Sequence, residues 1–325
     1  MRFKVIIIGI IFWTISIAGY SQSIQLLETD SSVNFLVNDI QVLVYQKSKT
    51  AVPFGVDPTF SKSGFIHPLA TASGQVLTRI QPEDHYHHYG IWGPWTKTKI
   101  QEREVDFWNL GDGKGRVYFD QVVRKSLDEK SAEITVRQNH FDLTAGESPS
   151  LAIVENLRIR VEVLDEDRYQ VDYISEFTNQ LDSSILFESY RYGGGIAFRA
   201  RKEWGPENSR ILTSEGNDRG NSDGAKARWV LIDGVTGSSQ GSSGLLILSH
   251  PENFDHPEPL RVWPEDSNKG IENVFLNFTP TRFKSWEILA GKTYRLQYRL
   301  IVFDGDMKVI EAEEYWKAFS LQKYR

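Results

Sequence analysis

Apolar and polar residues alternate with a period of two through most of the chain after its N-terminal segment. In Leu157–Val163, apolar side chains at every second position alternate with Arg158, Arg160 and Glu162. This pattern is typical of a strand with one buried and one solvent-facing side. Similar runs predict further strands over residues 33–46, 116–124, 131–141, 168–178, 184–200, 228–233, 243–249, 272–278 and 294–302.

Turn-forming segments such as Asn38-Asp39 and Gly111–Gly115 separate these runs. Only Met307–Ser320 has the periodicity of a helix, with a predicted apolar stripe made of Val309, Ile310, Tyr315, Trp316 and Phe319. Many antiparallel strands and one late helix predict an all-β fold, a large antiparallel β-sandwich with a short C-terminal helix. Because no repeat or long linker divides the chain, we expect residues 22–325 to form a single β-sandwich domain.

The N-terminus has the pattern of an export signal. Arg2 and Lys4 precede the apolar run Val5–Ile17, and small residues before Gln22 offer a cleavage site. The run is shorter than the ~20 residues of a membrane span, so a short anchor is the weaker alternative. We therefore expect a signal peptide over residues 1–21, no membrane span after its cleavage, and a periplasmic or secreted protein.

Composition narrows the chemistry further. The 325 residues include no cysteine, which excludes disulfides, thiol catalysis and Cys-ligated metals. A formal charge of −6 gives no general attraction to nucleic acid. Nine Trp residues are many for this length, and flat rings suit sugar faces.

The densest group of chemically active residues is the segment DHYHHYGIWGPW at residues 84–95. If the segment is extended, His85 and His87 point to one side and His88 to the other. His85 and His87 could then bind a metal together with a third ligand, although the sequence requires no cofactor. Alternatively, these histidines act as a general base and its partner. Packing histidines are the third interpretation, which fits three of them beside Asp84 less well.

Further candidate site residues are spread over the rest of the chain. Catalytic carboxylate chemistry would involve Glu215, with Asp84 or Glu104 as its partner. Glu102, Glu104 and Asp106 fit a solvated edge strand equally well. Gly193–Gly195 indicates either close backbone approach to a ligand or a tight bend. The candidate substrate-binding residues are the sugar-stacking and polar side chains Trp92, Trp95, Tyr192 and His250 and the anion-binding arginines Arg79, Arg191, Arg219 and Arg228.

The strings SGFIHPLATASGQVLTRIQPEDHYHHYGIWGPWT, EVDFWNLG, YGGGIAFR, TSEGNDRG and SHPENF resemble a bacterial family of unknown function that carries a "methane oxygenase PmoA-like" label. The label implies nothing about methane oxidation here, since that enzyme's subunit is an integral membrane protein. The resemblance implies a galactose-mutarotase-like β-supersandwich. It also implies a place among exported Bacteroidetes proteins that degrade polysaccharides such as ulvan.

We therefore expect an exported enzyme acting on anionic, uronic-acid-containing oligosaccharides. Elimination by a lyase or dehydratase needs a base, a cationic clamp and an acid, for which the histidines and arginines are candidates. A glycoside hydrolase with paired carboxylates is the first alternative. A non-catalytic sugar-binding protein is the second, and it has no need of three histidines.

Overall fold

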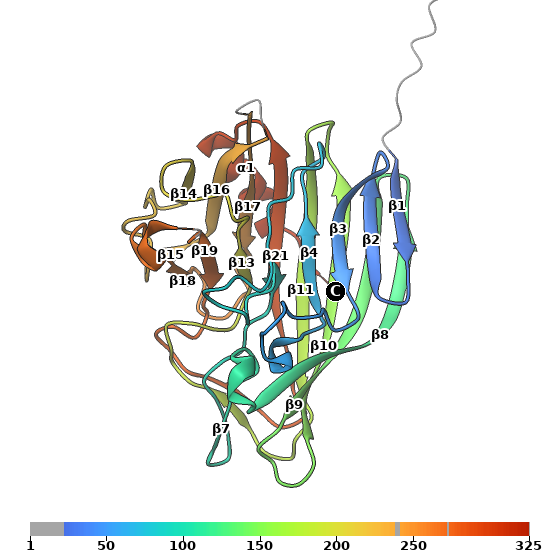
Figure 1. The fold of residues 1–325 in the computed structure, drawn as a ribbon, viewed down its shortest axis with the longest axis vertical. Helices are drawn as coiled ribbons and strands as arrows, with labels where there is room; N and C mark the ends of the chain where they lie inside the picture. The colour runs from blue at the N-terminus through green and yellow to red at the C-terminus, as the bar shows by residue number, and fades with distance from the viewer. Residues whose placement is uncertain (1–22, 238–240, 272, 325) are drawn as a thin grey trace, which may run out of the picture.

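The computed structural model describes residues 23–237, 241–271 and 273–324. The predicted signal peptide, residues 1–21, lies outside the described residues. Within them the chain forms three sheets in which all recorded strand pairs are antiparallel (Figure 1). No helix in this described part has the length and apolar run needed to cross a membrane.

The first sheet has nine described strands, and the second has eight. The nine-stranded sheet has the order β1 (Ile24–Glu28), β2 (Ser32–Val37), β3 (Ile40–Gln46), β4 (Phe65–Leu69), β5 (Ile91–Trp92), β13 (Ala197–Arg199), β19 (Phe275–Phe278), β18 (Glu258–Val262), β15 (Lys226–Ala227). The eight-stranded sheet has the order β14 (Ser209–Thr213), β16 (Trp229–Thr236), β17 (Gly241–Ser249), β21 (Thr293–Asp304), β11 (Arg168–Asn179), β10 (Ser150–Val163), β9 (Ser131–Asp142), β8 (Gly115–Leu127).

A four-stranded sheet and short helical segments complete the described fold. The small sheet has the order β20 (Trp286–Ile288), β12 (Ile185–Phe187), β6 (Thr98–Ile100), β7 (Arg103–Val105). The helical segments are the 3-10 turns η1 (Pro58–Phe60), η2 (Leu110–Asp112) and η3 (Ser267–Gly270) and the helix α1 (Val309–Ser320). β7 is an edge strand, so the edge-strand interpretation is confirmed for Glu104; Glu102 lies in the preceding turn, and Asp106 follows the strand and is 8% exposed.

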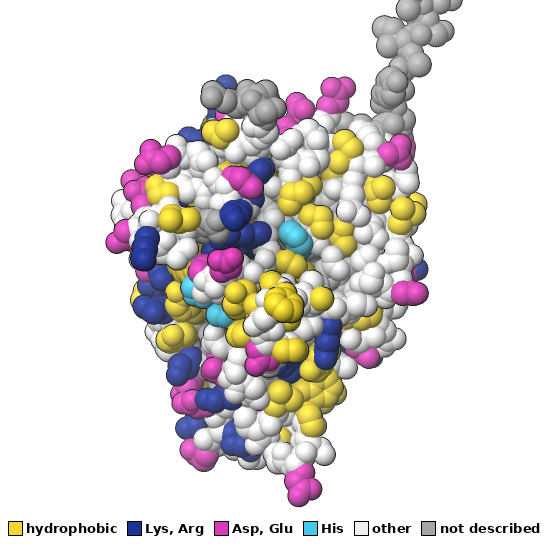
Figure 2. All heavy atoms as spheres, in the orientation of Figure 1, with side chains coloured by type: hydrophobic (Ala, Val, Ile, Leu, Met, Phe, Trp, Pro, Cys, Tyr) yellow, Lys and Arg dark blue, Asp and Glu magenta, His cyan; other side chains and the backbone are white. Residues whose placement is uncertain are grey.

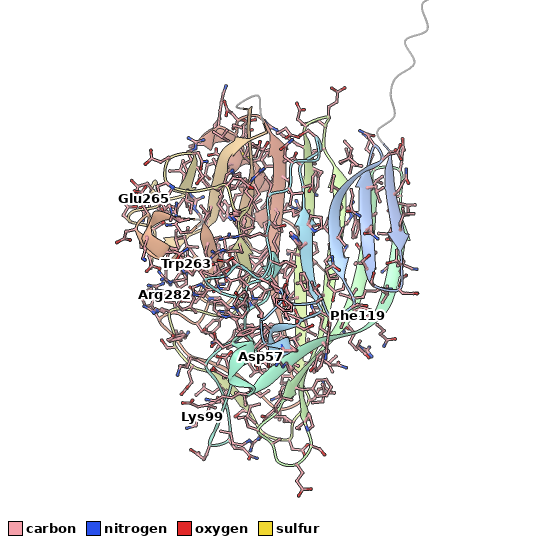
Figure 3. The ribbon with its side chains drawn as sticks, in the orientation of Figure 1. Asp57, Lys99, Phe119, Trp263, Glu265 and Arg282 are labelled. Atoms are coloured by element: carbon pink, nitrogen blue, oxygen red, sulfur yellow. The ribbon has the colours of Figure 1, made fainter. Side chains whose placement is uncertain are left out.

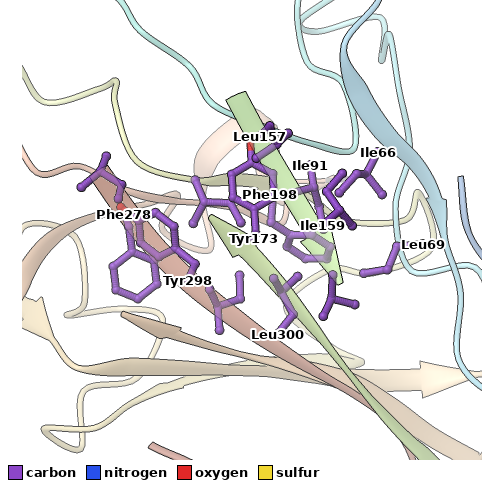
Figure 4. Close-up of a cluster of buried hydrophobic side chains, with 14 of the residues drawn as sticks. Ile66, Leu69, Ile91, Leu157, Ile159, Tyr173, Phe198, Phe278, Tyr298 and Leu300 are labelled. Carbon is purple, nitrogen blue, oxygen red and sulfur yellow. The ribbon is translucent and has the colours of Figure 1, made fainter. Parts of the chain in front are cut away.

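The main core lies between the two large sheets. Figure 4 shows Ile66, Ile91 and Phe198 of the nine-stranded sheet packed against Leu157 and Tyr298 of the eight-stranded sheet. Each of these side chains is at most 1% exposed. Burial of alternate apolar side chains from two facing sheets is the arrangement of a β-sandwich, so the predicted fold class is confirmed.

Each large sheet has a second face that is also partly covered. On the eight-stranded sheet, Trp229, Leu246 and Phe303 pack under Ala312 and Phe319 of α1. On the nine-stranded sheet, an aromatic cluster covers the outer face. This cluster contains Phe65, Tyr89, Trp92, Trp108, Leu110, Ala197, Trp263 and Phe275.

Two expected elements differ from the structure. The predicted strand over residues 184–200 is two short strands, β12 and β13, joined by a loop through Tyr190–Gly195. The predicted helix starts at Val309 rather than Met307. Val309 and Ile310 are 51% and 60% exposed, Tyr315 and Trp316 are half-buried, and Phe319 alone of the predicted stripe is fully buried. The helix packs on the sheet through its second half, which leaves its first turn in solvent.

Candidate functional site

The histidine segment is a compact loop rather than an extended strand. Ile80 and Tyr89 pair as an antiparallel bridge, which closes the loop at its base. Within it, the His85 amide donates to the Pro82 carbonyl at 2.9 Å and the His88 amide donates to the His85 carbonyl at 3.0 Å. These consecutive turns replace the alternation of an extended segment. His88 therefore lies on the same side as His85 and His87, contrary to the extended arrangement considered from the sequence.

The three imidazole rings form one group, with centroids 4.7 to 5.4 Å apart. His88 is 1% exposed and stacks on Phe275 at 4.9 Å and on Trp108 at 5.7 Å. Histidine side chains reach the surface near basic groups in Figure 2. The aromatic cluster thus carries the histidines outward from the sheet.

Strand alternation explains why this cluster faces away from the core. In β13, Phe198 belongs to the main core while Ala197 belongs to the aromatic cluster. Since neighbouring side chains of a strand point to opposite faces, Arg199 lies on the same face as Ala197. The Arg199 side chain has 0% exposure and lies directly beneath the histidine loop.

Arg199 binds Asp84 through both carboxylate oxygens, at 2.8 and 3.0 Å. The same carboxylate lies 3.0 Å from Nδ1 of His85. Burial alone would raise the pKa of Asp84, but hydrogen bonds with His85 and the charge of Arg199 outweigh it and lower that pKa to about 2. Asp84 is therefore a fixed anion at neutral pH.

This arrangement determines the tautomer of His85. An ionised carboxylate only accepts hydrogen bonds, so Nδ1 of His85 carries a proton and donates it to Asp84. In the neutral ring, Nε2 is then left with a lone pair. The His85 side chain is 36% exposed, so that nitrogen is within reach of a ligand. His85 has the chemistry of a base held by a carboxylate.

His88 has the opposite tautomer for a related reason. Its Nδ1 faces a guanidinium nitrogen of Arg199 at 3.4 Å. A guanidinium only donates hydrogen bonds, so Nδ1 accepts and Nε2 carries the proton. Burial lowers the pKa of His88 well below its ordinary value, and the neighbouring His87 and the charge of Arg199 lower it further. His88 is therefore a neutral hydrogen-bond donor.

His87, like His88, is a neutral imidazole. Burial lowers its pKa to about 4, and the neighbouring His85 adds to that effect. Its ring packs edge-on against Trp108 at 5.6 Å. At neutral pH His87 is uncharged.

The histidines line a pocket of about 220 Å³, called here the central pocket, together with Trp108, Asn109, Tyr190, Arg191 and Tyr192. Arg191 is exposed, and no described residue forms an ion pair with it. Its guanidinium lies 5.3 Å from the Tyr192 ring centroid. An unpaired guanidinium in a concave wall is suited to bind a carboxylate of a ligand.

The Tyr192 hydroxyl oxygen accepts from Arg261 Nη2 at 3.0 Å and from Trp263 Nε1 at 3.2 Å. Both partners only donate, so the phenolic proton of Tyr192 is directed elsewhere. Tyr192 also lines the central pocket.

Several predicted site residues lie outside the central pocket. Trp95 is 3% exposed in the main core and stacks on Phe187 at 3.9 Å. Arg228 binds Glu313 of α1 at 2.8 and 2.9 Å and also contacts Glu215 at 3.4 Å. The structure thus uses Arg228 to attach the helix, and it leaves Glu215 exposed at that attachment.

The remaining predicted residues support the site or other parts of the fold. Trp92 is 2% exposed and lies beneath His88 at 5.4 Å. Arg219 is 3% exposed and donates to the backbone carbonyls of Trp263 and Asn273, so it braces Trp263 from behind. Arg79 contributes positive charge near His88. The remaining histidine of the set, His250, is buried beside the C-terminus, 3.0 Å from the Gln322 carbonyl.

The triple glycine forms a tight bend. The Gly193 amide donates to the Asn277 side chain at 3.0 Å, and the Gly194 amide donates to the Pro94 carbonyl at 2.6 Å. These amides are satisfied within the protein, so the bend interpretation accounts for the segment. Its effect on the site is to direct Tyr190–Tyr192 over the histidines.

Sequence reasoning missed three residues that shape the site: Arg199, Arg261 and Trp263. Arg199 stands in the run AFRAR, where alternation alone suggests a solvent-facing arginine. No local signal indicates that a distant carboxylate covers it. In EPLRVWPED, Arg261 is the penultimate residue of β18 and Trp263 directly follows the strand, which ends in Trp-Pro. A ring and a cation at a strand end could have marked that position.

The structure also bears on the metal interpretation of His85 and His87. Over the described residues there is no group of three or more His, Asp or Glu side chains arranged to hold a metal ion. Nδ1 of His85 is bound to Asp84, as described above.

Fold and site together define an antiparallel β-sandwich protein with a histidine-lined pocket on the outer face of one sheet. A model described as "Family of unknown function (DUF6807)" matches residues 32–317, and the chain belongs to that family. A search of curated proteins gives no match.

Two solved structures illustrate similar chain arrangements. Heparan sulfate lyase HepC from Pedobacter heparinus is 8% identical with a TM-score of 0.40, and the match covers 88% of this chain and 37% of that one. A GalM/aldose epimerase homologue from C. elegans is 8% identical with a TM-score of 0.34, covering 88% of this chain and 100% of that one. The chain thus spans little more than a third of the lyase's length. At these values neither match carries an argument about chemistry.

Proposed function

We propose that this protein is an exported carbohydrate-active enzyme that acts on uronic-acid-containing oligosaccharides by acid–base elimination, as a lyase or dehydratase. One observation carries the proposal. The central pocket combines a carboxylate-held imidazole, His85, with the unpaired guanidinium of Arg191, and no carboxylate is among its lining residues. Ulvan-type fragments are one source of such substrates to test, and export rests on the sequence pattern of residues 1–21.

The elimination assigns one task to each of three side chains. Arg191 binds the uronate carboxylate and stabilises the negative charge that develops next to it. Nε2 of His85 removes the proton from the carbon beside the carboxylate, and a carbon–carbon double bond forms as the neighbouring carbon–oxygen bond breaks. The Tyr192 hydroxyl gives its proton to the departing oxygen. Water leaves if that oxygen is a hydroxyl, and a shortened sugar leaves if it is glycosidic.

Hydrolysis by paired carboxylates has less support. It needs two carboxyl groups on either side of the scissile bond, one of them protonated. Asp84 is held as an anion by Arg199, and its pKa of about 2 does not suit a proton donor. Glu104 pairs with Lys114 at 3.2 Å, and Glu215 pairs with Arg228.

A non-catalytic sugar-binding protein also has less support. Sugar binding needs rings and hydrogen-bonding groups, but it gains nothing from a buried Asp84–Arg199 pair that fixes the tautomer of an exposed imidazole. Burying such a pair has a desolvation cost. In an enzyme, the orientation of the base His85 by this pair would offset that desolvation cost.

The test is incubation with uronic-acid-containing oligosaccharides, followed by mass spectrometry of the products. We expect loss of one water for dehydration, or cleavage with an unsaturated uronate for a lyase; gain of one water instead would indicate a hydrolase. His85→Ala, Arg191→Ala and Tyr192→Phe should each lower turnover by about 10²- to 10⁴-fold.

Matched controls are His256→Gln, which removes a histidine outside the central pocket, and Tyr118→Phe, which removes a tyrosine hydroxyl outside the central pocket. Both should keep turnover within a few-fold of the unsubstituted protein. If binding persists in all proteins but no product forms in any, the sugar-binding alternative is correct. Metal analysis of the purified protein, with and without chelator, tests the His85 and His87 metal interpretation separately.

A further inference from the structure

Two more hollows adjoin the central pocket. One of about 220 Å³ shares Asn109 and Tyr190 with it, and another of about 440 Å³ shares His85 and Tyr192 with it. Because each hollow shares lining residues with the central pocket, the three are adjacent, with the central pocket in the middle, and are together called the groove here. Figure 3 labels Trp263, which lines the larger hollow, and Lys99 of β6, the strand that begins beside the smaller one.

The smaller hollow, called here the acidic hollow, has more carboxylates than cations. Its ionisable lining residues are Lys97, Glu104, Asp106, Asp112 and Lys114, so two ammonium groups face three carboxylates. Glu104 and Lys114 neutralise each other at 3.2 Å. Lys97 and Asp112 form no ion pair with any described residue. The local balance is therefore one negative charge.

Asp106 is fixed in the wall of this hollow. It is 8% exposed, and its Oδ1 accepts from the amides of Trp108 and Asn109 at 2.8 and 2.7 Å. Its Oδ2 accepts from the Thr96 hydroxyl and the Asn109 side chain, both at 2.6 Å. Four donors hold the carboxylate in place, so it cannot move away from a ligand in the hollow.

The larger hollow has a different character. Its cation, Arg261, is neutralised by Asp223 at 2.8 Å, and its carboxylate, Asp84, is neutralised by Arg199. The rest of its lining offers the Trp263 ring and the polar side chains of Ser267 and Asn268. Neutral pairs, hydroxyls and a ring suit an uncharged sugar unit.

We propose that the groove binds at least three consecutive sugar units and selects an uncharged neighbour for the reacting uronate on the side of the acidic hollow. Arg191 then recognises the acid at the central unit. A carboxylate or sulfate ester on the unit in the acidic hollow meets the net negative charge that Asp106 and Asp112 leave beside Lys97 and is repelled, whereas an uncharged unit is not. This inference rests on the proposed function, because it takes the central pocket as the place of the uronate.

The test is calorimetric binding of uronate-containing oligosaccharides of one, two and three units. Each trisaccharide carries the uronate as its central unit. One trisaccharide has no further acid, and the others carry a sulfate ester or a second carboxylate on one of the two neighbouring units. The acidic trisaccharides are prepared in both versions, with the acid on either neighbour. We expect affinity to rise with each added neutral unit. An acidic group on one of the two neighbours should lower affinity about three- to tenfold at low salt, and less at physiological ionic strength.

The key variant is Asp112→Asn, because it removes one carboxylate charge at an exposed position. It should raise the affinity for the disfavoured acidic trisaccharides about three- to fivefold, and leave the affinity for neutral-neighbour trisaccharides unchanged. Asp120→Asn is the matched control, since Asp120 is an exposed aspartate on β8 that lines none of the three hollows. It should change neither affinity.

The outcomes separate this inference from the proposed function. If the protein eliminates acidic-neighbour substrates as readily as neutral ones and Asp112→Asn changes nothing, the selection is wrong while the enzyme proposal stands. Equal binding of one and three units overturns the extended groove. If the expected selectivity is found without any eliminated product, the groove stands and the elimination is wrong. Absence of binding to every oligosaccharide overturns both.

Discussion

At the scale of single residues, Arg199 organises the site without facing the pocket itself. It has 0% side-chain exposure, and it contacts both Asp84 and His88. One fixed cation thus determines the charge of Asp84, and through Asp84 the tautomer of His85. His85 and His88 carry their proton on different ring nitrogens, because Nδ1 of His85 faces a hydrogen-bond acceptor and Nδ1 of His88 faces a donor.

We predict that Asp84→Asn lowers both turnover and stability. The amide can present its NH₂ group to His85, which favours the wrong tautomer, so turnover should fall by about 10²- to 10⁴-fold. Arg199 would lose its carboxylate partner in a buried position, at a cost of about 3–5 kcal/mol in the free energy of unfolding. Turnover assays and urea denaturation measure the two effects.

The double variant Asp84→Asn with Arg199→Gln is the control for this prediction. Removing the buried charge as well should recover part of the lost stability but none of the lost turnover. If Asp84→Asn retains full turnover, His85 does not depend on Asp84 and the assigned tautomer is wrong.

At the scale of elements, short strands and bends position the site. β13 places Phe198 in the core and its two neighbours on the outer face. The Gly193–Gly195 bend then turns the chain so that Tyr190–Tyr192 lies over the histidine loop. All three glycines have positive φ, from 59° to 104°. A side chain at these positions would strain the backbone.

We predict that Gly195→Ala destabilises the protein much more than Gly291→Ala. The two glycines have similar φ values of 59° and 65°, so an alanine meets similar backbone strain at both. A Cβ at Gly195 would lie 2.3 Å from the Phe278 carbonyl oxygen, whereas Gly291 has open space around it. Gly195→Ala should therefore cost about 2 kcal/mol or more beyond the control.

Thermal or urea denaturation of both variants measures this difference. Because the bend carries Arg191 and Tyr192, Gly195→Ala should also weaken oligosaccharide binding, while Gly291→Ala should leave binding unchanged. Equal destabilisation of the two variants would show that close packing at the bend contributes nothing.

At the scale of the whole molecule, several buried histidines link stability to pH. Burial lowers the pKa values of His67, His87 and His256 to about 4. In the unfolded chain these groups titrate near 6.5. As the pH falls from about 7 toward 4, the unfolded chain binds protons that the folded protein does not.

We predict that the free energy of unfolding falls by an amount on the order of 5 kcal/mol between about pH 7 and pH 4.5. Burial raises the pKa of Glu258 to about 7, which has the opposite effect because that carboxyl binds its proton more tightly when folded. This single carboxyl group offsets only part of the combined effect of the three histidines. Urea denaturation across this pH range measures the slope, and His256→Gln should make it shallower without changing the central pocket. A stability that is constant over this range contradicts the prediction.

The sequence determined the fold class and located the segment on which the proposed site is built. Period-two alternation directly reflects which side of each strand is buried, so β9, β10, β11 and β21 could be predicted from local pattern alone. The three histidines beside Asp84 also indicated a site, because they lie next to one another in the sequence and can be recognised without the tertiary structure. The sequence alone could not decide whether Gly193–Gly195 contacts a ligand or forms a tight bend.

Only the tertiary structure decided which charges meet. Arg191, Arg219 and Arg228 are equivalent candidates in the sequence, yet one lines the central pocket, one braces Trp263 and one attaches α1. Arg199 lies 115 residues from Asp84 and forms the pair on which the site depends. Ion pairs form through proximity in space, and in a sandwich of antiparallel strands that proximity follows from sheet order, which local patterns do not contain.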